Sequence, residues 1–229
     1  MKQAVKNTVK GAYSAVLTGT GALAAWLRLR PSRRDPWILN YHHIAPEAFE
    51  SHLRAITRYY NVATLDACCD YLAGQADLPP NSVVLTFDDG YEQVYAELFP
   101  LLQRYETPVT LYVATTPVDE GGHLWFNRVK ALVHTTDATS VTLGDKHFAL
   151  GGDRGEAYVA VMRHLNAQNL ATRDAMVDTL LDGADPPDEW LAPCRLLSWD
   201  QIHAMRELVT IGGHTRTHPC LSRLSRVEA

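Results

Sequence analysis

Short apolar runs mark the predicted strands in the first half of the chain. The run at 82–87, Ser-Val-Val-Leu-Thr-Phe, is apolar and β-branched, and it predicts a buried strand. Similar runs predict strands at 37–41 and 109–114. Polar residues follow the run at 82–87 directly, so we expect that strand to end at Phe87.

Helical patterns fill the intervals between these runs. Apolar side chains recur at helical spacing at Phe49, Leu53, Ile56 and Tyr60. Thr64 can cap a second short helix that ends at Gly74. A helical segment at 91–105 should bend or restart near Pro100, because proline lacks the N–H that the preceding turn would bond.

The segment from about residue 117 to residue 193 resembles an insertion. It contains a predicted hairpin that turns at Gly144-Asp145, since the flanking residues alternate between apolar and polar. Helical stretches follow at about 158–168 and 172–181. We expect the acidic, proline-containing stretch at 182–189 to be a solvated loop.

Helix and strand signals resume after this segment. Ser198 and Gln201 form a capping-box pattern that opens a helix to Leu208. A short strand follows at 209–211, and Gly212-Gly213 should release the chain from it. The alternation of strands and helices predicts an α/β fold with a parallel sheet or barrel.

Polar clusters stand at two predicted strand ends. Asp88-Asp89-Gly90 follows one strand, and a stretch beginning at His214 and ending at His218 follows another. In parallel α/β folds the chemistry collects at the carboxyl ends of the strands. Both clusters therefore lie where an active site is expected.

The composition limits the classes of protein to which this chain can belong. The chain has 229 residues, 46% of them hydrophobic, which suffices for one sizeable core in a soluble protein. Its formal net charge of −5 gives no electrostatic reason to expect a nucleic-acid partner. The four cysteines match neither zinc nor redox spacings and are expected to be free thiols.

The first 34 residues form a separate segment, ahead of a domain expected at 35–229. A moderately apolar stretch at 12–27 lies between lysines and an arginine-rich linker. It fits a helix on a membrane surface or on the domain, a secretion signal, or a core helix. The downstream arginines oppose export, so we expect a cytoplasmic or inner-membrane-associated protein, with secretion as the alternative.

The adjacent carboxylates have two interpretations. Asp-Gly is a common turn pair, and a simple turn is the more frequent explanation. However, two neighbouring carboxylates at the end of a buried strand repel each other, and each needs a positive partner or a hydrogen bond. A divalent cation would supply that charge.

The histidine pair is the second candidate for metal binding. His214 and His218 are four residues apart, which on one helical turn would place both rings on the same face, a spacing that zinc sites use. Histidine pairs at this spacing also occur by chance. One carboxylate and both histidines would give three protein ligands with an open position, the pattern of a catalytic metal site. The second carboxylate could then act as a base.

Two motifs resemble those of the polysaccharide deacetylase family, the NodB homology domain of carbohydrate esterase family four. They are Leu85-Thr86-Phe87-Asp88-Asp89-Gly90 and Gly213-His214-Thr215-Arg216-Thr217-His218-Pro219. The resemblance extends from about residue 37 to residue 229. It implies a partial, distorted (β/α) barrel that removes N-acetyl groups from amino-sugar polymers.

The same resemblance implies residue roles. Asp89, His214 and His218 would hold a divalent metal, most naturally zinc, and Asp88 would be the general base. Thr215 would support the histidine loop. The family's later Arg-x-Pro-aromatic-Gly and Leu-x-His motifs have no match in this chain, so we expect an incomplete domain with little activity of its own.

Two other functions stay open at this stage. One is a metal- or sugar-binding protein without catalysis, and the other is an amidohydrolase of the same fold that acts on small amides. Several further residues could belong to a functional site, but packing or surface exposure explains each of them more simply. They are His42 and His43 beside the cleft, Cys220 as a ligand, and Trp125 and Phe126 as a platform for a sugar ring.

Overall fold

A computed structural model describes residues 35–184 and 186–226 of the chain. The predicted N-terminal segment at 1–34 lies outside the described residues. None of the helices within 35–184 or 186–226 is long and apolar enough to cross a membrane. The division into a segment at 1–34 and a domain at 35–229 stays a prediction.

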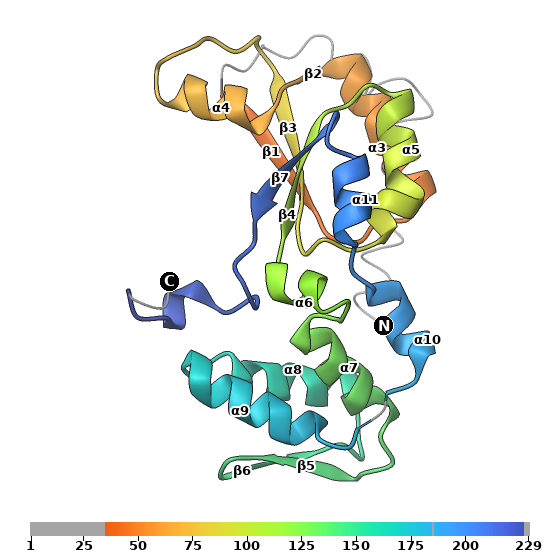
Figure 1. Ribbon diagram of the computed structural model, residues 1–229, viewed down its shortest axis with the longest axis vertical. Coiled ribbons are helices and arrows are strands. Elements are labelled where there is room, and N and C mark those ends of the chain that lie inside the picture. Colours follow the sequence, from red (N-terminus) through yellow and green to blue (C-terminus); the bar gives the residue numbers. More distant parts are fainter. Residues whose placement is uncertain (1–34, 185, 227–229) are drawn as a thin grey trace, which may run out of the picture.

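A parallel sheet forms the centre of the upper lobe in Figure 1. Its order is β1-β3-β4-β7, and a further short strand, β2 (Asn61–Val62), pairs with the start of β3. The four strands in this order are β1 (Trp37–Tyr41), β3 (Ser82–Phe87), β4 (Val109–Val113) and β7 (Val209–Gly213). Neighbours along this order are parallel. The predicted α/β class with a parallel sheet is confirmed.

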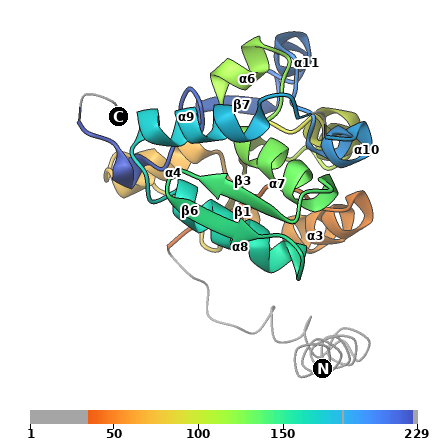
Figure 2. The same ribbon diagram turned by 90° about the horizontal axis from the view of Figure 1, so that it is seen from below.

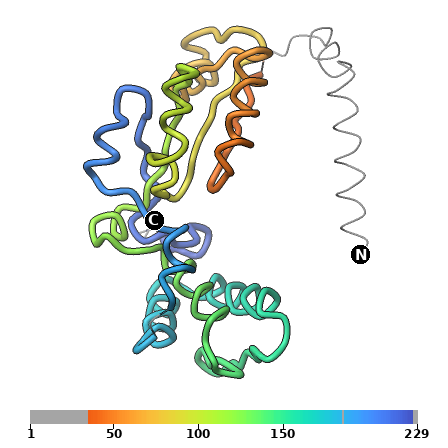
Figure 3. Tube along the Cα trace, turned by 90° about the vertical axis from the view of Figure 1, so that its right-hand side faces the viewer, coloured from red at the N-terminus to blue at the C-terminus, as the bar shows by residue number. Residues whose placement is uncertain are grey.

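Helices connect the strands and cover the sheet, as parallel pairing requires. They are α3 (Pro46–Tyr59), α4 (Leu65–Leu72), the π-helix η1 (Val94–Leu98), α5 (Phe99–Arg104) and α11 (Trp199–Ala204). The predicted caps are present: Thr64 accepts from the backbone N–H of Ala67, and Ser198 forms a capping box with Gln201. Figure 3 shows α3 and α5 beside the strands.

The central strand β3 is buried along its whole length. Val83, Leu85 and Phe87 belong to the main apolar core, which also receives side chains from α3, η1, α5 and α11. The alternate residues Val84 and Thr86 are buried as well. Burial on both faces explains why this segment is continuously apolar rather than alternating.

A second lobe lies below the sheet, between β4 and α11 in the chain (Figures 1 and 2). Its elements are α6 (Thr115–Asp119), α7 (Trp125–Thr135), β5 (Ser140–Leu143), β6 (Lys146–Ala149), α8 (Arg154–Leu165), α9 (Leu170–Leu181), α10 (Asp188–Leu191) and the 3₁₀ helix η2 (Ala192–Cys194). Residues of α7, β5, α8 and α9 share an apolar core of their own, separate from that of the sheet. The predicted hairpin at Gly144-Asp145 is confirmed.

Several predicted boundaries are wrong. Helix is not continuous from residue 91, because Tyr91 pairs with Leu196 in an isolated bridge and the π-helix begins only at Val94. Gly212 and Gly213 do not end β7 but pair with Tyr112 and Val113.

Other differences concern helices. The acidic stretch predicted as loop becomes helical at α10, and α11 ends at Ala204 rather than at Leu208. The helices α6 and α7 were not predicted from the sequence, although apolar side chains recur at helical spacing along α7.

Candidate metal centre

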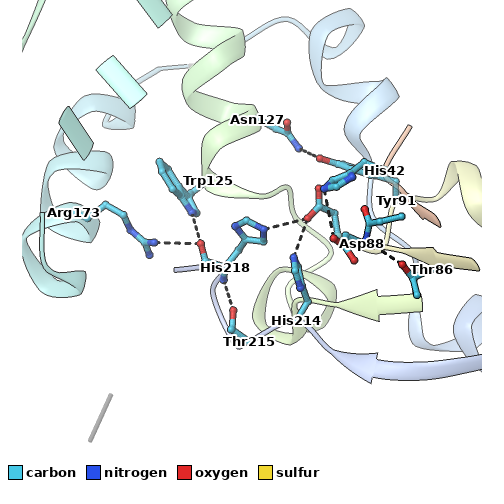
Figure 4. Close-up of polar contacts among 12 residues, drawn as sticks. His42, Thr86, Asp88, Tyr91, Trp125, Asn127, Arg173, His214, Thr215 and His218 are labelled. Atoms are coloured by element: carbon cyan, nitrogen blue, oxygen red, sulfur yellow. Dashed lines mark hydrogen bonds and ion pairs between the residues drawn. The ribbon is translucent and has the colours of Figure 1, made fainter. Parts of the chain in front are cut away.

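Three side chains from two distant parts of the chain meet at one point. One ligand atom from each of Asp89, His214 and His218 lies within 4.8 Å of the others. Oδ1 of Asp89 is 3.5 Å from Nε2 of His214 and 3.2 Å from Nε2 of His218. The two imidazole rings approach each other edge to face, with centroids 4.8 Å apart. Figure 4 shows His214 and His218 turned toward this common point.

The carboxylate in this group lacks the partners that burial demands. Asp89 is only 3% exposed, and its Oδ1 finds no hydrogen-bond partner among the described residues. Both Nε2 atoms approach this oxygen, but neither approach has the geometry of a hydrogen bond. A buried carboxylate oxygen that makes no hydrogen bond is unfavourable, and a divalent cation between the three ligand atoms would offset that penalty. The residues therefore fit a metal ion.

The pKa shifts of Asp89 and His214 also favour a cation at this point. Burial alone would raise the pKa of Asp89, but its contacts with His214 and His218 outweigh burial and lower that pKa below its ordinary value. The contact with Asp89 is in turn the main reason that the pKa of His214 is raised. Positive charge is therefore favoured at the point where the three ligands converge.

The end of β3 delivers the acidic pair. The backbone N–H of Asp88 donates to the carbonyl of Tyr41 at 2.9 Å, which continues the pairing with β1 by one residue. The chain then turns sharply, since Asp89 has a φ of 74° and Gly90 a φ of 77°. A Cβ on Gly90 would lie 2.9 Å from Cγ1 of Val113, so only glycine fits here.

The end of β7 delivers the histidines on a strained loop. His214 donates its N–H to the carbonyl of Val113 at 2.8 Å. Thr215 and His218 both have left-handed backbone, with φ values of 66° and 54°, and each such residue costs about 1–2 kcal/mol. Oγ1 of Thr215 accepts from the N–H of His218 at 3.0 Å. The support expected from Thr215 is present, but the expected helical turn is not: the loop itself brings both rings together.

Asp88 lies beside the ligand group but is not part of it. Its side chain is 17% exposed, and Oδ2 is 3.7 Å from Nε2 of His42. His42 follows β1, and its side chain is 55% exposed, so its ring approaches Asp88 from the solvent. One carboxylate of the pair is therefore buried among the histidines, and the other faces solvent and a third histidine.

The model for the polysaccharide deacetylase family matches residues 75–229, which include both strand-end clusters. The chain belongs to the polysaccharide deacetylase family. This confirms the resemblance carried by the two motifs.

Individual members of the deacetylase family match only in part. The YxkH protein of Bacillus subtilis (strain 168) is 25% identical over 139 residues, which are 56% of this chain and 49% of that protein. The poly-beta-1,6-N-acetyl-D-glucosamine N-deacetylase of Escherichia coli (strain K12) is 51% identical over 35 residues, which are 15% of this chain and 5% of that enzyme. This chain thus spans about half the length of YxkH and a small part of the Escherichia coli enzyme.

One solved deacetylase structure aligns with most of this chain. Streptococcus pyogenes deacetylase PplD in complex with acetate aligns over 86% of this chain and 62% of its own, with 14% identity and a TM-score of 0.47.

Tyr91 lies next to the candidate metal site, and the sequence did not single it out as a site residue. It is 3% exposed, and its hydroxyl accepts from Nδ2 of Asn127 at 3.0 Å. Burial foremost, and then the charge of Asp89, raise the pKa of Tyr91 far above its ordinary value, so the phenol stays protonated. His43 packs on its ring with centroids 3.9 Å apart, which confirms the packing interpretation of His43.

The second lobe also reaches the site. The ring centroids of Phe126 and His218 are 5.0 Å apart. Nε1 of Trp125 and Nη1 of Arg173 donate to the backbone carbonyl of His218 at 3.2 Å and 3.3 Å. No spacing rule links residues so far apart in the sequence, so only the fold could reveal these contacts. Cys220 is exposed and lies outside the metal-ligand group found among the described residues.

Proposed function

We propose that this chain acts as a metal-dependent hydrolase that removes N-acetyl groups from amino-sugar polymers. The convergence of Asp89, His214 and His218 around a buried carboxylate oxygen that makes no hydrogen bond carries the proposal. Membership of the polysaccharide deacetylase family supports the reaction class. The named activity of the Escherichia coli relative supports an N-acetylated glucosamine polymer as substrate.

Asp89, His214 and His218 would hold the metal, and zinc suits a set of two imidazoles and one carboxylate. When bound, such an ion polarises the acetyl carbonyl and lowers the pKa of water. The described part of the chain contributes these three side chains to the group, and three protein ligands are typical of metal sites that keep a position open for water or substrate.

Asp88 would act as the general base. Its carboxylate adjoins the ligand group and is partly open to solvent, so it can accept a proton from the attacking water. The water oxygen forms a bond to the acetyl carbon as one of its protons passes to Asp88. The carbon–nitrogen bond then breaks as that proton passes from Asp88 to the nitrogen, which releases the amine of the sugar and acetic acid, ionised to acetate at neutral pH. His42, 3.7 Å from Oδ2 of Asp88, would orient this base.

Acetate release tests the proposal. The zinc-loaded chain and its Asp88→Asn variant would be incubated with oligomers of β-1,6-linked N-acetylglucosamine, with chito-oligosaccharides, and with small linear and cyclic amides. Zinc-dependent acetate release from the sugars is the expected result; it should be weak, because two later family motifs have no match in this chain, and it should be lost in the variant. Zinc binding without acetate release would favour the non-catalytic alternative. Turnover of the small amides alone would favour the amidohydrolase alternative.

A further inference from the structure

The backbone of His218 is held from outside its own loop. His218 has a φ of 54°, and its N–H is bound by the side chain of Thr215. Its carbonyl oxygen accepts two further hydrogen bonds, from Nε1 of Trp125 at 3.2 Å and from Nη1 of Arg173 at 3.3 Å (Figure 4). Trp125 begins α7 and Arg173 lies on α9, so both donors come from the second lobe.

Arg173 is unusual in being buried. Asp89 and Arg173 are the two charged side chains with almost no exposure in the described part of the chain, at 3% and 4%. A buried guanidinium is unfavourable unless its donors are paired, and buried ion pairs contribute little to stability compared with an apolar core. The position of Arg173 therefore calls for an explanation other than stability.

The partners of Arg173 fix its orientation. Nε and Nη2 donate to Oδ1 of Asp174 at 2.9 Å and 2.6 Å. The guanidinium carbon lies 4.7 Å from the centroid of the Trp125 ring, a cation–π contact. With two nitrogens held by Asp174 and one face held by Trp125, the remaining nitrogen, Nη1, points at the His218 carbonyl. Arg173 and Trp125 thus act on His218 as one rigid unit.

We propose that Arg173, aligned by Trp125 and Asp174, is a positioning residue that holds the backbone of His218 in the conformation required for metal binding. The inference rests on the proposed metal site. It gives the second lobe a role at that site, because the lobe would supply the outer contacts that fix a ligand. Outer-shell contacts of this kind typically change metal affinity by about 10- to 100-fold.

A purely structural contact between the lobes would behave differently. It would lower the stability of the metal-free chain and leave zinc affinity unchanged as long as the chain is folded. A positioning contact should weaken zinc binding in a chain that is still folded. The two roles therefore separate when affinity and stability are measured on the same variants.

The test compares three variants of the full chain. Arg173→Met keeps the length and apolar stem of the side chain but removes its donors, and Asp174 is exposed enough to be hydrated without its partner. Trp125→Phe removes a donor to the same carbonyl and keeps an aromatic ring. Arg163→Met, at an exposed position on α8, is the matched control. Zinc affinity is measured by competition with a chromogenic chelator, coordination by the visible spectrum of the cobalt-loaded chain, and folding by circular dichroism and thermal unfolding without metal.

We expect Arg173→Met and Trp125→Phe each to weaken zinc binding by about 10-fold or more. We also expect a changed cobalt spectrum in both and no change in Arg163→Met. Trp125→Phe decides the question if Arg173→Met does not fold. Folded variants with the parent affinity and spectrum would overturn the inference while leaving the metal site intact. A parent chain that binds no zinc would overturn the metal site and, with it, this inference.

Discussion

Oδ1 of Asp89 lies 3.2 Å from Nε2 of His218, although the two residues follow different strands of the sheet and β4 runs between those strands. Parallel strands end at the same edge, so β3 and β7 can deliver side chains to one point across the intervening strand. The contact depends on left-handed backbone at both residues. The position of both side chains therefore depends on the turns that follow β3 and β7.

Removal of either histidine should abolish tight zinc binding. His214→Ala and His218→Ala each delete one of three protein ligands, so affinity should fall by more than the roughly 100-fold that loss of an outer contact can cause. Chelator competition at neutral pH measures the change. His147→Ala, at an exposed position on the hairpin, should bind zinc like the parent. A double His214→Ala, His218→Ala variant that still binds one zinc tightly would refute the assignment.

The two neighbouring aspartates should respond differently to the same substitution. Asp88→Asn should keep the metal and lose turnover by about 10²- to 10⁴-fold, because a general base is removed and a ligand is not. Asp89→Asn should lose the metal itself. Zinc content after dialysis and acetate release, measured on the same preparations, separate the roles. Equal loss of zinc in both variants would contradict this division.

The metal-free chain should lose stability as the pH rises through the pKa of His214 in the folded state. That pKa is raised by Asp89, so the stabilising contribution is complete below the unfolded value of about 6.5 and disappears above the folded value. The pKa of Asp89 is lowered, so its contribution is present above about 3.9 and is lost as the pH falls through its folded value.

Stability of the metal-free site should therefore be greatest between these limits. Urea unfolding at a series of pH values measures it, with His214→Ala as the comparison. The variant should show a smaller decline on the alkaline side. Zinc affinity should rise with pH over the same interval, because a ligand imidazole must be unprotonated. A parent and variant with identical pH profiles would show that the contact of His214 with Asp89 does not contribute.

Alanine at Gly90 should damage the site as well as the fold. Gly74 and Gly90 both have positive φ, so alanine should cost about 1–2 kcal/mol of unfolding free energy at either position. At Gly90 the new Cβ would also lie 2.9 Å from Val113, whereas at Gly74 no heavy atom lies within 4 Å. Gly90→Ala should therefore lose about 1–3 kcal/mol more.

Urea unfolding of both variants measures the difference, and zinc affinity shows its consequence for Asp89. Gly74→Ala should bind zinc normally. Equal destabilisation of the two variants would mean that the contact with Val113 relaxes freely and does not hold the turn.

The sequence by itself determined the elements around β3 and singled out the three candidate metal ligands. The continuous apolar run before Asp88, the cap at Thr64 and the capping box at Ser198 are local signals, since each depends on residues a few positions apart. The acidic pair and the histidine pair were also visible, because ligand chemistry belongs to residue types and the two family motifs are contiguous.

Only the tertiary structure decided how those ligands meet and what holds them. The histidine spacing predicted a helical turn, but His218 lies in a loop and has a φ of 54°. Thr215, Trp125 and Arg173 form hydrogen bonds with its backbone. Two of these partners come from helices that pack around a separate core. Contacts between segments distant in the chain arise from packing of whole elements, and local periodicity carries no information about which elements will touch.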